Sequence, residues 1–148
     1  MNVRDNDVAG TIPTQIKQCP LLDTFRVDEN CLQGTIPSQI YSLTALTQLT
    51  LNVNAFSGSI ATQIGVLIRM EDLWLHRNSL TGTLPSELLM MASLTSLRLF
   101  SNGLTGVVPQ LPLLLSMSNE WCVVLFFLPF KLCYAYFIFT LVNWTILL

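Results

Sequence analysis

The feature that most constrains the fold of this chain is a repeat of 24 residues. Asparagine and glycine both recur at this step, and each Asn lies four residues before its Gly. The asparagines are Asn6, Asn30, Asn54, Asn78 and Asn102, and the glycines are Gly10, Gly34, Gly58, Gly82 and Gly106. Unrelated loops would not keep both residue types at the same spacing through the whole series. The sequence therefore predicts a solenoid of stacked units.

One complete unit, from Leu46, reads LTQLTLNVNAFSGSIATQIGVLIR, and the next, from Met70, reads MEDLWLHRNSLTGTLPSELLMMAS. The units share the pattern LxxLxLxxNxLxGx[IL]Pxx[IL]xxLxx. With this pattern the chain resembles the plant-type leucine-rich repeat proteins, over residues 1 to about 117. The resemblance implies an α/β class and a right-handed, horseshoe-shaped solenoid with short parallel strands. It also implies a likeness to the ectodomains of receptor-like proteins.

Each unit is expected to begin with a short strand. In Leu73-Trp74-Leu75, alternation places the two leucines on one face and Trp74 on the other. Stacked units would then form a parallel sheet along one side of the solenoid, with the leucines in the core.

The recurring polar and special residues have structural explanations. Asn78 follows the strand where the chain turns, and its amide can pair with the backbone of adjacent turns. Gly82 permits a positive φ or a close backbone approach, and Pro85 stops ladder bonding. Apolar residues on the convex side are predicted to point inward, namely Ile16, Ile40, Ile64 and Leu88.

The pattern divides the chain into a solenoid over 1–117, a linker over 118–120 and an apolar tail over 121–148. Four units are complete, from Leu22, Leu46, Met70 and Leu94, while the first lacks its opening three residues. The resemblance implies a cysteine-bearing cap after a signal peptide, whereas MNVRDNDVAG has no apolar stretch. A truncated gene product and a short intracellular variant both fit this beginning.

The cysteines and the single histidine give no cofactor or metal site. Cys19 occupies the position of Leu43 and Leu67 in later units, so we expect it to be buried as a small apolar residue. The other cysteines are Cys31, beside the Asn column, and Cys122 and Cys133 in the tail. One histidine without a suitable cysteine pair argues against zinc, and the redox compartment stays open.

The tail is predicted to cross a membrane. Residues 121–148 carry one charge, Lys131, and as a helix they would extend about 42 Å, more than the roughly 30 Å of a bilayer core. Pro129 and Lys131 interrupt the stretch, so 132–148 forms the core of the candidate span. Two alternatives remain, in which the tail packs on the last repeat or is a non-native extension.

The side of the membrane that the repeats face is left open. A C-terminal span without a signal peptide would leave the repeats cytosolic, and Lys131 on their side agrees weakly with the positive-inside tendency. The family resemblance instead implies an extracellular recognition domain. Localisation is therefore predicted as single-pass membrane without an assigned orientation.

The side chains opposite the leucines form three columns at the repeat step. One holds Asn2, Arg26, Thr50, Trp74 and Arg98, the next Arg4, Asp28, Asn52, His76 and Phe100, and the third Asp5, Glu29, Val53, Arg77 and Ser101. We expect these columns to be solvent-exposed and polarised, with acidic residues toward the N-terminus. Aromatic and arginine side chains often anchor interfaces. The predicted partner-binding residues are Trp74, His76, Arg77, Arg98 and Phe100.

These features predict a non-catalytic recognition module that binds a peptide or protein partner, or an anionic or C-terminal peptide group, on its concave strand face. No nucleophile motif or carboxylate pair accompanies His76, which argues against an enzyme. A net charge of −2 without a basic stripe argues against nucleic acid. Alternatives are a soluble or intracellular interaction or inhibitor scaffold, a truncated product with a non-native tail, and a surface that binds no ligand.

Overall fold

The computed structural model describes residues 1–106, which fold as a stack of repeated turns. Each full turn contains a short strand, a second strand and a 3-10 helix. The strands are β1 (Ala9–Gly10), β2 (Thr24–Arg26), β3 (Cys31–Thr35), β4 (Gln48–Thr50), β5 (Ala55–Ser59), β6 (Asp72–Trp74), β7 (Ser79–Thr83), β8 (Ser96–Arg98) and β9 (Gly103–Thr105). The helices are η1 (Thr14–Gln18), η2 (Ser38–Ser42), η3 (Thr62–Val66) and η4 (Ser86–Met90).

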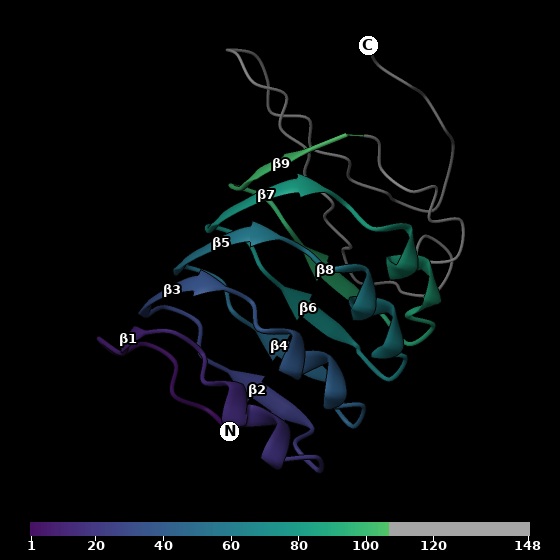
Figure 1. Cartoon of the computed structure of the whole chain (residues 1–148), viewed down its shortest axis with the longest axis horizontal. Helices are drawn as coiled ribbons and strands as arrows, with labels where there is room; N and C mark the ends of the chain where they lie inside the picture. The colour runs from purple at the N-terminus through teal and green to yellow at the C-terminus, as the bar shows by residue number, and fades with distance from the viewer. Residues whose placement is uncertain (107–148) are drawn as a thin grey trace, which may run out of the picture.

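The strands form two parallel sheets. The first has the order β2-β4-β6-β8 and the second the order β1-β3-β5-β7-β9. Figure 1 shows these two sheets and the column of 3-10 helices running side by side from the purple end of the stack to the green end. The first sheet was predicted, whereas the second was not. The second sheet is made by the segments around the repeated glycines, where apolar and polar residues do not alternate strictly.

The core lies between the sheets and the helices, as the leucine pattern predicts. Leu73 and Leu75 are 0% and 1% exposed, while Trp74 between them is half-buried. Ile40, Ile64 and Leu88 of the 3-10 helices are buried in the same core. Full burial of one such side chain stabilises the fold by about 1.5–3 kcal/mol. The inward orientation predicted for the convex positions is confirmed.

The asparagine column joins neighbouring turns, as predicted. The Oδ1 of Asn54 accepts a hydrogen bond from the Leu32 amide at 2.9 Å, and its Nδ2 donates to the Val27 carbonyl at 2.9 Å. The same Nδ2 also donates to the Leu51 carbonyl within its own turn. Asn30, Asn78 and Asn102 repeat this pattern. Each amide therefore pairs backbone groups that would otherwise be buried without partners.

The glycines of the 24-residue repeat adopt the left-handed backbone region, with φ of 78° at Gly58 and 80° at Gly82. This conformation is unfavourable for L-residues, whereas glycine adopts it freely. At Gly58 the neighbouring turn is also close, because an added Cβ would lie 2.9 Å from Thr35 Cγ2. The positive φ predicted from the repeat is confirmed, and the contact with Thr35 is a second reason for glycine at this position.

The prediction that Cys19 is buried was wrong. Cys19 is exposed, although Leu43 and Leu67 at the same position of later turns are both 0% exposed. Cys19 belongs to the first turn of the stack, whereas Leu43 and Leu67 lie in later turns. The position in the repeat therefore does not by itself determine burial.

The predicted C-terminal hydrophobic helix, the linker over 118–120 and the tail over 121–148 lie outside the described residues, as do residues 107–117 of the predicted solenoid. Within 1–106, no helix has both the length and the apolar character needed to span a bilayer.

Candidate binding site on the strand face

Two of the rows formed by outward side chains along the first sheet make up what we call the strand face. The parallel register pairs Arg26 with Thr50, Thr50 with Trp74 and Trp74 with Arg98. The second row lies two residues further along each strand and holds Asp28, Asn52, His76 and Phe100. Residues two apart point to the same side of a strand, and adjacent strands are about 4.8 Å apart.

Arg98 and Trp74 form a closely packed pair in the first row. The guanidinium carbon of Arg98 lies 4.1 Å from the centroid of the Trp74 ring. The indole Nε1 of Trp74 donates a hydrogen bond to Ser96 Oγ at 2.9 Å. Because the indole is held by this bond and the cation lies over its ring, the guanidinium is positioned before any ligand binds. Its planar N–H donors suit carboxylate or phosphate oxygens.

His76 and Phe100 form a second pair beside the first. Their rings stack with centroids 4.4 Å apart and planes inclined by 23°. Burial lowers the pKa of His76 to about 4, and the charges of Arg98 and Arg77 add to this shift. The Asp28 carboxylate opposes it. His76 is therefore neutral at ordinary pH, and the cationic character of this region comes from the arginines.

The prediction that the columns are solvent-exposed was wrong for part of the grid. Asp28, Thr50, Asn52 and His76 are buried, with exposed fractions of 4%, 0%, 5% and 8%. Arg26 is paired with Thr50, and the Phe100 ring stacks on His76. The sequence marks which residues leave the core, but cross-strand packing determines how much solvent reaches them.

Arg77 is placed differently from the other predicted binding residues. It is exposed and has φ of 56°, in the left-handed region that its whole column adopts. The members are Asp5, Glu29, Val53, Arg77 and Ser101. The strand therefore ends before this column, and Arg77 lies on the turn beside His76. No residue type in the column signals this conformation, since these side chains seldom adopt it.

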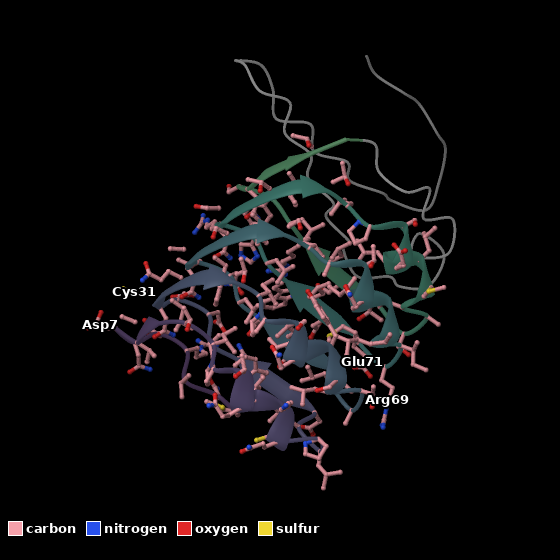
Figure 2. All side chains as sticks on the ribbon, in the orientation of Figure 1. Asp7, Cys31, Arg69 and Glu71 are labelled. Carbon is pink, nitrogen blue, oxygen red and sulfur yellow. The ribbon has the colours of Figure 1, made fainter. Side chains whose placement is uncertain are left out.

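Few of the charged side chains along the stack form ion pairs. Within residues 1–106 the one ion pair joins Arg26 Nε to Asp28 Oδ1 at 3.8 Å. Arg77 and Arg98 have no ion-pair partner in this part of the chain. Carboxylates lie along the stack, with Asp5 and Asp7 in the first turn and Glu71 and Asp72 in the turn of Trp74. Figure 2 shows Asp7 at the N-terminal end of the stack, close to Cys31.

One feature of this face was missed by sequence reasoning. In the described residues, three buried side-chain atoms have no hydrogen-bond partner, namely Arg26 Nε, Asn52 Oδ1 and His76 Nδ1. All three belong to the strand face. Residues 1–106 include no cluster of His, Cys, Asp or Glu that could hold a metal ion. The site therefore offers hydrogen-bonding groups and arginine cations.

Comparisons with known proteins also find leucine-rich repeats in this chain. A family profile described as Leucine Rich Repeat matches residues 69–91. Among solved structures, the Arabidopsis receptor kinase HAESA in complex with the peptide hormone IDA and the co-receptor SERK1 matches with 33% identity and a TM-score of 0.74. That match covers 77% of this chain and 20% of the matched chain. The chain therefore carries leucine-rich repeats that resemble those of plant receptor ectodomains.

Other solved leucine-rich repeat proteins resemble it to a similar degree. The BIR3–SERK2 complex from Arabidopsis thaliana matches with 40% identity and a TM-score of 0.64, over 69% of this chain and 55% of that one. The plant peptide hormone receptor RGFR1, in complex with RGF2, matches with 28% identity and a TM-score of 0.69, over 70% of this chain and 17% of that one. This leucine-rich repeat chain thus spans less than two thirds of each.

The solved relatives of this leucine-rich repeat protein also include a plant ice-binding protein, with 30% identity and a TM-score of 0.65 over 68% of this chain and 33% of that one. No curated protein matches the sequence. Since one solenoid carries such different activities, the fold does not decide the ligand. The ligand must be inferred from the side chains of the strand face.

Proposed function

We propose that this leucine-rich repeat protein is a non-catalytic recognition module whose strand face binds a peptide or protein through an anionic group. The observation that carries the proposal is the Arg98 guanidinium held over Trp74, with Arg77 nearby and no carboxylate paired with either arginine in residues 1–106. One similar structure holds a bound peptide hormone and another is of a peptide hormone receptor, which supports a peptide or protein as the ligand class.

The binding residues have different roles in this proposal. Arg98 supplies directed donors, Trp74 holds the guanidinium in place, and Arg77 adds a cation at the turn. Phe100 is half-buried and offers apolar contact area, while the neutral His76 supports its ring by stacking. Aromatic and arginine residues with this arrangement resemble the anchors that dominate protein interfaces.

A displayed library of random peptides with free C-termini tests the proposal. Enriched peptides should contain an acidic group, and their affinity for Arg98→Ala should fall about tenfold or more, because a hydrogen-bonded ion is lost. Arg69→Ala is the matched control, since Arg69 is exposed and lies after η3, near the 3-10 helices in Figure 2. Equal affinities for both variants would refute the assignment.

We further propose that residues 121–148 anchor the module in a membrane, with 132–148 as the spanning core. The support is the sequence of the tail, which has Lys131 as its one charge and sufficient length for a bilayer. Carbonate extraction of the full chain provides the test. Retention in the membrane pellet is expected, whereas release into the soluble fraction would favour a soluble interaction or inhibitor scaffold instead.

A further inference from the structure

One of the five repeat asparagines is followed by glycine. Counted by these asparagines, the turns run from the first, with Asn6, to the fifth, with Asn102. The next residue is Gly103 in the fifth turn, whereas each earlier turn has a residue with a side chain there, namely Asp7, Cys31, Ala55 and Ser79. Glycine leaves the backbone nitrogen after the asparagine accessible, because it has no Cβ and rotates freely. This nitrogen can attack the side-chain carbonyl carbon of Asn102, which makes the pair chemically distinct from the other four.

The Asn102 side chain joins the fifth turn to the fourth. Its Oδ1 accepts a hydrogen bond from the Leu80 amide at 3.0 Å, and its Nδ2 donates to the Leu75 carbonyl at 3.0 Å. Within the fifth turn, Nδ2 also donates to the carbonyls of Leu99 at 3.0 Å and Phe100 at 3.5 Å. The side-chain nitrogen therefore faces three carbonyl oxygens, which can only accept. An amide satisfies these oxygens, whereas an ionised carboxylate has no hydrogen to donate to them.

The same hydrogen bonds control the attack. Ring closure ties the carbonyl carbon of Asn102 to the Gly103 nitrogen and expels Nδ2, so the bond from Nδ2 to the Leu75 carbonyl must be given up. The bond from the Leu80 amide to Oδ1 has to break as the side chain turns. Both bonds cross between turns, and the reaction therefore requires the fifth turn to open from the fourth. Folded proteins open locally in this way at a lower free energy than global unfolding.

We propose that Asn102-Gly103 is a site of spontaneous deamidation, which proceeds through opening of the fifth turn and disconnects that turn from the stack. The Gly103 nitrogen forms a bond to the side-chain carbonyl carbon of Asn102, the bond from that carbon to Nδ2 breaks, and ammonia leaves with the proton of the backbone N–H. Water then opens the cyclic imide at either of its carbonyl carbons. The product is an aspartate at this position, linked to Gly103 through its main chain or through its side chain. The net reaction takes up water and releases ammonia, without an oxidant or a reductant.

Neither product restores the joint between the turns. With the ordinary main chain, a carboxylate lies where Nδ2 of Asn102 was, against the carbonyl oxygens of Leu75 and Leu99. These carbonyls lose their donor, and a charge is placed in a partly buried position, so closing the turn becomes unfavourable. With the side-chain linkage, the main chain is longer by a carbon atom just before β9, and the register of β9 on β7 is disturbed.

The strand face depends on the same joint. Trp74 belongs to the fourth turn, while Ser96 and Arg98 belong to the fifth. The indole Nε1 of Trp74 donates to Ser96 Oγ at 2.9 Å, and the Arg98 guanidinium carbon lies 4.1 Å from the indole centroid. Both contacts cross between the turns that Asn102 connects, so deamidation separates the cation from the indole. This inference goes beyond the proposed function and does not require that a ligand binds.

Peptide mapping of the full chain by mass spectrometry tests the site. During incubation at neutral pH, conversion of amide to acid should accumulate at Asn102 before it appears at the other repeat asparagines. Gly103→Ser should slow the conversion about tenfold or more, because a side chain hinders the backbone nitrogen. Serine is a fair control, since Ser79 occupies the same position in the fourth turn. Equal conversion at all repeat asparagines, or a rate unchanged by Gly103→Ser, would overturn the assignment.

Hydrogen exchange at the Leu80 amide tests the opening step, because this amide donates to Asn102 Oδ1. Relative to the chain unfolded in urea, folding should slow Leu80 exchange and Asn102 deamidation by the same factor, to within about threefold. Deamidation as fast as in urea would show that the two turns do not hold the side chain. Deamidation far slower than Leu80 exchange predicts, including no detectable product, would show that opening of the fifth turn does not lead to reaction. Either result refutes the mechanism.

Asn102→Asp tests the consequence. It should lower the melting temperature by about 5 °C or more and shift the NMR signal of the Trp74 indole N–H. Asn6→Asp is the matched control, because the Asn6 side chain bonds only carbonyls of its own turn, and it should leave the indole signal in place. In wild-type protein aged at neutral pH, the fraction of shifted indole signal should equal the fraction of converted Asn102, which provides a measurement if the variant does not fold. An indole signal that stays in place while Asn102 converts would show that the fifth turn remains attached, and the inference would be wrong.

Discussion

The methyl group of Thr35 would crowd a side chain at Gly58, since an added Cβ at Gly58 would come within 2.9 Å of Thr35 Cγ2. The glycine also has a positive φ of 78°. Two physical causes therefore disfavour a side chain at one position of β5. They can be separated by substitution, because Gly10 also has a positive φ, but a Cβ added there would have nothing within 4 Å.

We predict that Gly58→Ala lowers the free energy of unfolding by about 2–3 kcal/mol, from left-handed strain plus the contact with Thr35. Gly10→Ala should lower it by about 1 kcal/mol, from strain alone. Urea unfolding of both variants measures the difference. Equal losses would mean that the contact with Thr35 relaxes without cost.

The asparagine column gives a second prediction. Asn78→Ala leaves the Phe56 amide and the Leu51 carbonyl without their partner on Asn78, so we expect a loss of about 3 kcal/mol or more. Asn6→Ala should cost about 1 kcal/mol or less, because the Asn6 side chain is exposed and bonds only the carbonyls of Val3 and Arg4. Thermal unfolding compares the two, and a similar cost would contradict the role of the column in joining turns.

His76 predicts a dependence of stability on pH. Its pKa is lowered from 6.5 to about 4 in the folded state. Between these values the unfolded chain binds a proton that the folded chain does not, so stability falls as the pH falls from 6.5 to 4, by at most about 1.4 kcal/mol per pH unit. Above 6.5 and below 4 the His76 contribution should be constant.

The control for this dependence is His76→Gln, which removes the titrating group. The difference in unfolding free energy between the two proteins, measured from about pH 3.5 to about pH 8, isolates His76 from the carboxylates. A difference that does not change with pH would show that His76 titrates normally in the folded protein.

Val53 predicts a stabilising substitution. It has φ of 55°, which is strained for a β-branched side chain, whereas Asn tolerates this region. Val53→Asn should raise the free energy of unfolding by about 1 kcal/mol. Val66→Asn, at an exposed valine of η3, should give no such gain. A loss of stability in Val53→Asn would show that packing of Val53 outweighs its backbone strain.

The parts of this fold that sequence could predict are those fixed within one turn. Asn54 and Gly58 have roles that follow from backbone hydrogen bonding and φ, and Leu73 and Leu75 follow from alternation. Each of these requirements selects one kind of residue at a fixed position of the repeat. The repeat, the first sheet and the inward leucines could therefore be inferred without a structure.

The parts that were missed depend on contacts between turns. Cys19 is exposed although the same repeat position is buried in later turns, and Asn52 is buried although it lies in an outward-facing row. The candidate site shows the same division. Trp74 and Arg98 could be identified as outward-facing, but the cation over the indole and the unpaired atoms arise only when the strands are assembled.

The Asn54 amide bonds only its own turn and the turn before it, and the strands of each sheet pair in steps of one turn. Energetic coupling between sites should therefore decay from turn to turn, as in a one-dimensional chain of neighbours. Substitutions in adjacent turns should show non-additive effects, while those two or more turns apart should add almost independently. A solenoid of this kind can thus change the residues that meet one part of a ligand without altering the stability of the rest.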